Sequence, residues 1–216
     1  MEDKRRQILD AALAIADEDG LDAVSMRSVA ARVGMSPMAL YPYVGSKAAL
    51  LDGLVGRLLG ELSTGDALRP MQPVGTGPGQ RSQEWREGLR TLANRMRALA
   101  RRHPSAFMLL LSRPSVTPEA AGAVDAVYQG LLEAGVPPKD VPRIERLVST
   151  FVLGFAASEV NGRFAVDDPQ LRARRGVDLP AHKTLGAVLL EVDWDAEFEA
   201  DLRDLEQLIA SLVRPG

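Results

Sequence analysis

The chain has 216 residues, of which 46% are hydrophobic and 25% charged, and its formal net charge is −3. This composition is typical of a globular protein with one substantial core, or one core and a small appended module. No apolar run approaches the roughly 18 residues that a membrane helix needs, and the absence of cysteine excludes disulfides and thiolate metal sites. We therefore expect a cytoplasmic protein with no membrane-spanning segment.

The first predicted element is an amphipathic helix over residues 4–19. Its apolar face is formed by Ile8, Ala12, Ile15 and Ala16, and Gly20 ends it.

Residues 25–47 predict two short helices joined by a tight turn, followed by the start of a third helix. Ser25 is a suitable N-cap, and Gly34 can adopt the left-handed backbone that often ends a helix. Ser36 then caps a second helix, with Pro37 at its first position. This order is that of a helix-turn-helix, although the spacing alone fits an ordinary pair of packed helices equally well.

The side chains of the second short helix favour DNA binding. Leu40 and Val44 are expected on its buried side, while two tyrosines and a methionine point away from the core. Such a surface, with basic residues at its edges, suits phosphates at the rim and base edges at the centre. The residues predicted to contact DNA are Ser25, Arg27, Ser36, Met38, Ala39, Tyr41, Tyr43 and Lys47.

The charge of this region is unusual for a DNA-binding module. Residues 1–60 carry seven Lys/Arg and eight Asp/Glu, which is a balance of −1. DNA binding must therefore depend on where the basic residues lie. We expect modest non-specific affinity, with specific binding dependent on two half-sites.

The remainder of the chain also predicts helices. A leucine-rich connecting helix covers residues 49–62, and residues 63–80, with four glycines and three prolines, are expected to form a flexible loop. Further helices are predicted over 83–103, 105–111, 117–134, 140–164 and 195–213, with a polar loop over 165–181. No segment alternates with the period of a β-strand, so the predicted fold class is all-α. The expected domains are a helix-turn-helix domain (1–48), the connecting helix (49–62), the loop (63–80) and a larger helical domain (81–216).

Four segments carry a more specific signal: SMR at 25–27, VGMS at 33–36, ALYPYV at 39–44 and SKAALL at 46–51. Together they closely resemble the DNA-binding domain of the TetR family of transcriptional repressors, over residues 5–62. Pro42 departs from the family pattern; it removes one backbone hydrogen bond and can tighten or kink the end of the helix. Residues 83–164 more loosely resemble the tetracycline-repressor-type C-terminal domain.

The resemblance implies that the C-terminal domain binds a small molecule and forms a homodimer through a four-helix bundle. The candidate dimer helices are residues 140–164 and 195–213, whose apolar faces fit a monomer core equally well. The need for two DNA half-sites favours the dimer.

The residues predicted to face the ligand are Trp85, Leu89, Met96, Phe107, Leu111, Tyr128, Phe151, Phe155 and Glu159. Glu159 stands out because a buried acid needs a partner, either a cationic ligand or an internal donor. A stripe of aromatic or methionine residues at helical spacing is more often part of an ordinary core than of a pocket. Tetracycline is not expected, because Leu109 occupies the place where the resemblance implies a metal-bound histidine. No metal or cofactor is predicted.

The function that these patterns predict is ligand-responsive transcriptional regulation. The simplest form is a repressor that binds a double-stranded DNA operator and is released by a small-molecule effector. With two histidines, no cysteine and no nucleophile motif, the sequence gives no support for an enzyme. A helical protein-interaction module without specific DNA binding is the alternative.

Overall fold

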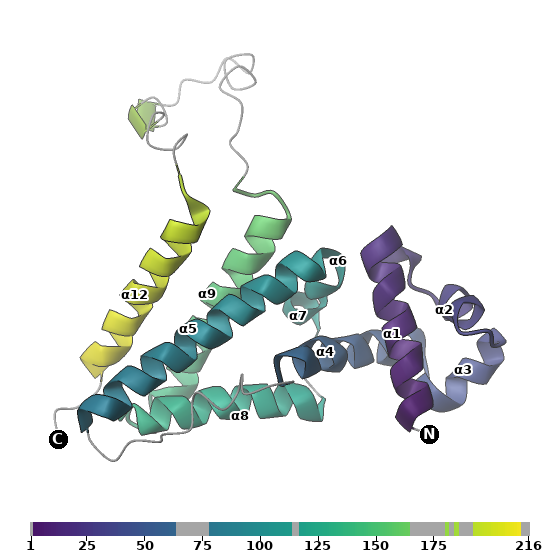
Figure 1. Ribbon diagram of the computed structural model, residues 1–216, viewed down its shortest axis with the longest axis horizontal. Helices are drawn as coiled ribbons and strands as arrows, with labels where there is room; N and C mark the ends of the chain where they lie inside the picture. Colours follow the sequence, from purple (N-terminus) through teal and green to yellow (C-terminus); the bar gives the residue numbers. More distant parts are fainter. Residues whose placement is uncertain are drawn as a thin grey trace.

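The computed structural model describes residues 2–63, 78–113, 117–164, 180–181, 184–185 and 192–212. Every regular element in these ranges is helical (Figure 1), which confirms the all-α prediction. None of the helices in the same ranges combines the length and hydropathy needed to cross a bilayer.

A small N-terminal head is formed by three helices: α1 (Glu2–Asp19), α2 (Met26–Arg32) and α3 (Pro37–Val44). Figure 1 shows α2 and α3 at the end of the molecule remote from α12 (Trp194–Leu212). Short-range signals define the ends of these helices, so the head follows the predicted boundaries closely.

The caps of α2 and α3 are formed as predicted. The Ser25 hydroxyl accepts a hydrogen bond from the Ser28 backbone N–H at 3.0 Å, and the Ser28 hydroxyl accepts one from the Ser25 N–H at 2.9 Å. The Ser36 hydroxyl accepts from the Ala39 N–H at 3.3 Å, with Pro37 at the first helical position. Gly34 has φ +69°, which a side chain would disfavour.

The helix α4 (Lys47–Ser63) leads from the head into a larger helical body. The body contains α5 (Pro78–Arg102), the short helices α6 (Pro104–Phe107) and α7 (Leu109–Ser112), α8 (Pro118–Glu133), α9 (Val141–Val160) and α12.

Four features of the helices differ from the prediction. Helix α4 includes Ser63, one residue beyond the predicted connecting helix. Helix α5 begins at Pro78 rather than at residue 83, because proline is well tolerated in the first turn of a helix. The predicted helix 105–111 is divided into two short helices at Met108. The predicted continuation of α9 beyond residue 160 is wrong: α9 ends at Val160, and Gly162 has φ +70°. Residues 64–77 and most of the predicted loop 165–181 lie outside the described residues.

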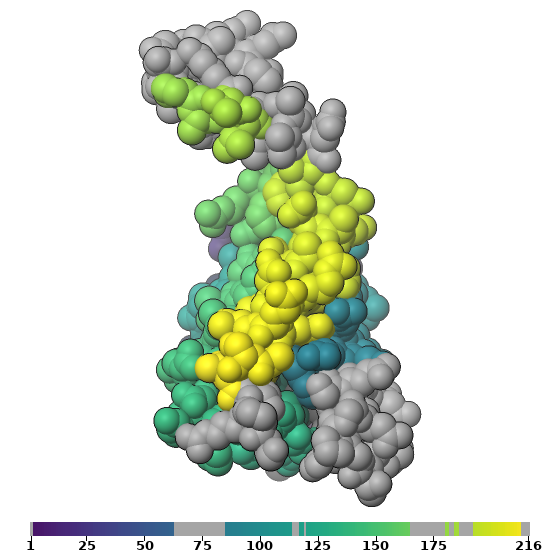
Figure 2. All heavy atoms as spheres, turned by 90° about the vertical axis from the view of Figure 1, so that its left-hand side faces the viewer, coloured from purple at the N-terminus to yellow at the C-terminus, as the bar shows by residue number. Residues whose placement is uncertain are grey.

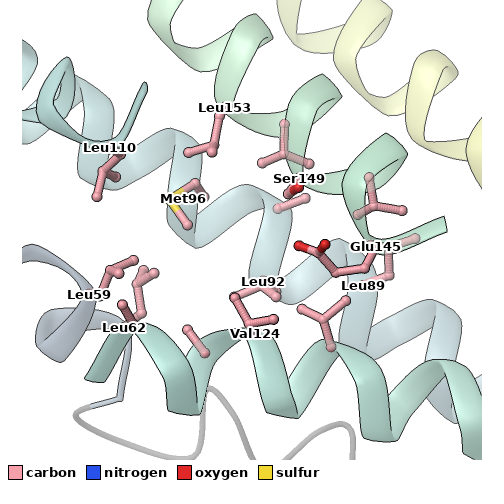
Figure 3. A pocket seen from close by; sticks show the side chains of 16 residues that line it. Leu59, Leu62, Leu89, Leu92, Met96, Leu110, Val124, Glu145, Ser149 and Leu153 are labelled. Atoms are coloured by element: carbon pink, nitrogen blue, oxygen red, sulfur yellow. The ribbon is translucent and has the colours of Figure 1, made fainter. Parts of the chain in front are cut away.

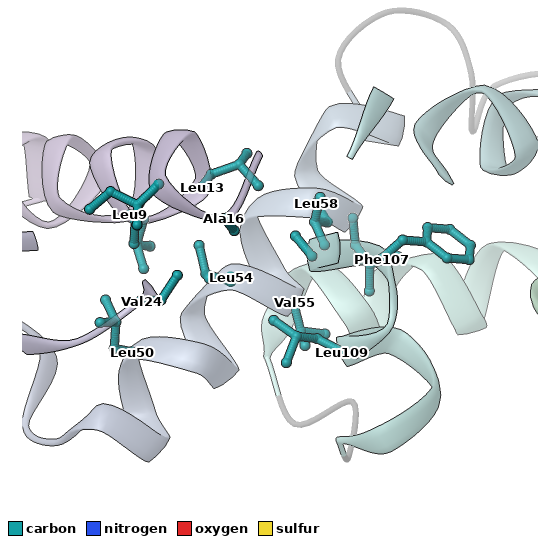
Figure 4. Close-up of a cluster of buried hydrophobic side chains, with 14 of the residues drawn as sticks. Leu9, Leu13, Ala16, Val24, Leu50, Leu54, Val55, Leu58, Phe107 and Leu109 are labelled. Carbon is teal, nitrogen blue, oxygen red and sulfur yellow. The ribbon is translucent and has the colours of Figure 1, made fainter. Parts of the chain in front are cut away.

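One hydrophobic cluster joins the head to the body. Figure 4 shows Leu54 and Leu58 of α4 between the side chains of α1 and those near α6 and α7. Phe107 is fully buried in this cluster. A second cluster lies within the body, where α5, α8, α9 and α12 meet. Burial of a large apolar side chain stabilises a fold by roughly 1.5–3 kcal/mol, so movement of α4 has to preserve or exchange these contacts.

Two glycines of α4 provide a test of how closely α1 and α4 approach. A Cβ on Gly53 would lie 2.7 Å from Leu9 Cδ2, whereas a Cβ on Gly60 would meet nothing within 4 Å. We expect Gly60→Ala to raise the free energy of unfolding by about 0.5–1 kcal/mol, because alanine is the better helix former. Gly53→Ala is expected to lower it, since overpacking costs about 1–3 kcal/mol. Urea denaturation measures both, and equal stabilisation by the two variants would contradict the close contact.

Candidate nucleic-acid interface and ligand cavity

Helix α3 presents two large side chains to solvent. Met38 is 74% exposed and Tyr41 is 43% exposed, whereas Leu40 is fully buried and Val44 is 6% exposed. The helix continues through Pro42 to Val44, so the proline does not break it. Anchored by its two buried residues, α3 can insert the opposite face into a groove.

The prediction that Tyr43 points away from the core is wrong. Its side chain is half-buried and packs against the cluster that joins head and body, and Ala39 is also half-buried. Tyr43 follows the buried Leu40 by three positions, which places both residues on neighbouring faces of one helix. The part of Tyr43 that reaches the surface borders a groove with Pro42, Arg5 and Arg6.

Basic side chains flank α3. Arg27 and Lys47 are exposed, and within the described residues no ion pair engages either of them. Both are therefore free to contact phosphates. Arg32, by contrast, is paired with Glu18, with 2.9 Å between its Nη1 and Oε1 of the carboxylate.

The two serines predicted to contact DNA differ in how far their hydroxyl groups are already hydrogen-bonded. The Ser25 hydroxyl is part-buried and is also hydrogen-bonded to the Ser28 hydroxyl, so the capping box satisfies it. The Ser36 hydroxyl is exposed and only accepts in its cap, which leaves its proton available to a phosphate oxygen.

The body contains an apolar cavity of about 180 Å³ (Figure 3). Five helices contribute to its wall: α4, α5, α7, α8 and α9. The lining residues are Leu59, Leu62, Leu89, Leu92, Ala93, Met96, Leu110, Ala120, Ala123, Val124, Val127, Glu145, Val148, Ser149, Val152 and Leu153.

Two residues predicted to face a ligand, Leu89 and Met96, line this cavity. The others lie outside its lining. Phe107 is fully buried in the cluster between head and body, and Leu111 is 46% exposed. The remaining aromatic residues belong to the second cluster: Trp85, Tyr128, Phe151 and Phe155.

Glu159 has internal donors instead of an unpaired carboxylate. Arg97 of α5, 4% exposed, donates to both carboxylate oxygens at 2.8 and 2.7 Å, and Arg101 donates at 2.6 Å. Both arginines also reach Asp195 of α12, at 2.7 and 2.8 Å. Burial raises the pKa of Glu159, but the hydrogen bonds from Arg97 and Arg101 outweigh it, so its pKa lies below the ordinary value. The group therefore ties α5, α9 and α12 together.

Polar contacts also link the head to the body. His103, at the end of α5, is 7% exposed, and its Nδ1 lies 2.8 Å from the Asp17 carboxylate of α1. Arg113, after α7, donates to Asp52 of α4 at 2.7 Å and to the Ala48 carbonyl at 3.0 Å. The N-terminal part of α4 is thereby attached to the body as well as to the head.

Most of the residues that line the cavity are not among those that the sequence predicts to face a ligand. The signal that could have indicated it lies in α9, where Glu145, Ser149 and Val152 recur at helical spacing beside Val148. These positions form a stripe on α9 that interrupts apolar residues with two polar ones.

Comparison with known proteins agrees with both halves of this architecture. The family described as "Bacterial regulatory proteins, tetR family" matches residues 8–54, and "Tetracyclin repressor-like, C-terminal domain" matches residues 77–207. The HTH-type transcriptional repressor DrrR1 of Streptomyces coeruleorubidus is 32% identical over 155 residues, which are 71% of this chain and 53% of that protein. This chain thus spans about half the length of DrrR1.

A second relative, an HTH-type transcriptional regulator of Saccharopolyspora erythraea, is 30% identical over 96% of this chain and 83% of its own length. Among solved structures, ActR of Streptomyces coelicolor in complex with (S)-DNPA superposes with a TM-score of 0.75 at 24% identity, covering 97% of this chain and 98% of ActR. The fold and the sequence matches agree, and the chain belongs to the TetR family of bacterial regulatory proteins.

Proposed function

We propose that this protein is a homodimeric repressor that binds a DNA operator through α3 and is released when a small molecule enters the cavity of the body. The observation that supports this most directly is the path of α4. Its residues Leu50 and Leu54 pack in the cluster that holds α1, while Leu59 and Leu62, farther along the same helix, line the cavity. A ligand that displaces the end of α4 therefore acts on the helix that supports the head.

The proposed reading head is the exposed face of α3. Met38 and Tyr41 would contact base edges in the major groove, while Arg27 and Lys47 contact phosphates on either side. The phosphate contacts supply affinity for any DNA, and the α3 side chains supply preference for one sequence.

The proposed dimer surface consists of α9 and α12. The two helices lie side by side (Figures 1 and 2). Each carries a large exposed leucine: Leu147 of α9 is 40% exposed and Leu208 of α12 is 42% exposed. Two-fold pairing of such a surface would set two α3 helices at a fixed separation. Successive major grooves lie ~34–36 Å apart, which is the spacing a dimer would have to provide.

The relatives support a repressor that responds to a ligand. DrrR1 is named a transcriptional repressor, and ActR has been solved with (S)-DNPA and with actinorhodin. In this chain, a ligand that binds better to a conformation with a different separation of the heads would shift the population away from DNA. A coupling free energy of about 1–3 kcal/mol changes operator affinity roughly 5–150-fold.

The test is selection of bound sequences from random DNA, followed by anisotropy titrations with the full-length protein. We expect a pseudo-palindromic site with half-sites about one turn of DNA apart. Compounds that stabilise the protein against heat are then added to the complex, and at least one is expected to release it. Failure to enrich any sequence at low salt would contradict the proposal and favour a protein-interaction module.

Filling the cavity should separate ligand response from DNA binding. Val124 of α8 lines the cavity and does not belong to the cluster that joins the head to the body, so Val124→Phe is expected to leave operator affinity within about twofold while weakening release at least tenfold. Release is measured as the ligand concentration that halves the anisotropy signal of the complex. Ala121→Phe, an exposed position on the same helix outside the lining, is the matched control and should respond normally. An unaltered response in Val124→Phe would place the effector elsewhere.

A further inference from the structure

The cavity wall contains two polar side chains within an otherwise apolar lining. Among the described residues that surround it, these are Glu145 and Ser149, one turn apart on α9. Figure 3 shows the Glu145 carboxylate oxygens projecting from α9 into the space beside Leu92 and Val124. Of the lining residues that the structure describes, Glu145 is the one that carries a charge.

The Glu145 carboxylate is unpaired within the described part of the chain, where no hydrogen bond or ion pair engages it. The nearby basic residues of α9 are directed elsewhere: Arg143 and Arg146 are exposed, and Arg143 pairs with Asp140 at 3.6 Å. The Ser149 hydroxyl donates to the Arg146 carbonyl at 3.4 Å rather than to the carboxylate. Glu145 thus contrasts with Glu159, which two arginines neutralise.

Glu145 is half-buried beside these apolar side chains, so its carboxylate has lost part of its contact with water, and a cation placed beside it would compensate that loss. The other described lining residues are apolar apart from Ser149, so they can accept a hydrocarbon body but offer a charged headgroup no second counterion. Charge and shape together therefore select a molecule with one cationic end and one apolar end.

We propose that the effector of this protein is a lipophilic cation, with an ammonium group held at Glu145 and an apolar body packed against the leucine, valine and methionine side chains of the cavity. This assignment rests on the proposed function, in which the cavity is the effector site. The volume of about 180 Å³ limits the enclosed part of the ligand. A dry apolar cavity of about 150 Å³ accepts benzene, so one aromatic ring with a short alkyl arm is the expected scale.

The experiment compares two probes of nearly equal length, 4-phenylbutylammonium and 4-phenylbutan-1-ol, by calorimetric titration of the full-length protein at pH 7. We expect the ammonium probe to bind at least tenfold more tightly than the alcohol. Glu145→Gln preserves the size of the side chain and removes its charge. This variant should lose that preference and bind the alcohol within about threefold of the unsubstituted protein.

Glu197→Gln is the matched control. Glu197 is an exposed acid of α12 outside the cavity lining, so this variant should keep the full preference for the ammonium probe. Thermal melting of both variants verifies that they fold.

Equal affinity for the two probes, absence of binding by either, or an unchanged preference in Glu145→Gln would overturn the assignment of a cationic ligand. These results are distinguishable from failure of the proposed function. If neutral compounds enter the cavity and release the operator, the proposed repressor function stands and only the proposal of a cationic ligand fails. Tight, Glu145-dependent binding of the ammonium probe without any effect on DNA would support the cation site and contradict the effector role.

Discussion

Tyr41→Ala is expected to lower affinity for the selected operator by roughly 30-fold to 10⁴-fold while leaving affinity for unrelated DNA almost unchanged. Loss of a base contact typically costs about 1–3 kcal/mol, and a two-fold symmetric complex loses it at both half-sites. Tyr41 is 43% exposed, and the buried Leu40 and Val44 remain to hold α3 in place. The free energy of unfolding should therefore stay within about 0.5 kcal/mol. Anisotropy titrations against operator and scrambled duplexes, at one fixed salt concentration, measure the ratio.

Two neighbouring variants serve as controls for this result. Lys47→Ala should weaken binding to both duplexes alike and flatten the salt dependence, because Lys47 is expected to contact phosphate. Tyr43→Ala should lower stability as well as affinity, since Tyr43 packs against the core of the head. Equal losses on operator and scrambled DNA in Tyr41→Ala would show that α3 does not read bases.

The head could be predicted from the sequence because its helix boundaries depend on single residues. Ser25 and Ser36 each cap a helix through the backbone N–H three positions on, and Gly34 takes a left-handed backbone. These are local choices of the chain, which tertiary packing seldom reverses.

The prediction that Tyr43 points away from the core fails because it neglects the rotation of the helix between Tyr41 and Tyr43. Each residue of an α-helix turns by about 100°, so Tyr41 and Tyr43 are separated by about 200° and cannot both point directly away from the core. With Leu40 and Val44 fixing the buried side, Tyr41 is the exposed one of the pair. The periodicity that identified the buried residues could have made this distinction.

The cavity could not be located in the same way because it depends on contacts between distant helices. Phe151 and Phe155 of α9 lie against Phe198 of α12, with ring centroids 6.0 and 4.8 Å apart, so these aromatic residues fill the core. The space remains where smaller side chains from five helices meet. Whether an acid such as Glu145 or Glu159 has a partner is likewise decided by the packing of other helices.

Arg97→Met is expected to lower the free energy of unfolding by about 3 kcal/mol. Removal of one partner from a buried ion pair typically costs about 3–5 kcal/mol, because the other charge is left uncompensated. The lower end applies here because Arg101 still donates to Glu159. The variant also loses the guanidinium packed over Phe155 and Phe198, at 5.3 and 4.8 Å from the ring centroids. Denaturation in urea at pH 7 gives the difference.

The matched control is Arg101→Met, which removes the same kind of side chain one turn later on α5. Its side chain is 50% exposed, so the expected cost is below about 1 kcal/mol. The double variant Arg97→Met with Glu159→Met should recover much of the stability lost in Arg97→Met, since it removes both charges together. A double variant no more stable than Arg97→Met would instead assign the loss to packing.

The contacts between Glu159 and the two arginines also predict how the free energy of unfolding depends on pH. The pKa of Glu159 lies below its ordinary value of 4.5 because the arginine hydrogen bonds outweigh burial, so the unfolded chain takes up this proton at a higher pH than the folded protein does. The stabilisation is therefore complete above the unfolded pKa and disappears as the pH falls through the lower, folded pKa. Glu159→Gln should accordingly be less stable than the unsubstituted protein at pH 7, and the difference should shrink as the pH falls below 4.5. A difference that does not change with pH would show that the carboxylate contributes by its shape and hydrogen bonds, with no contribution from its charge.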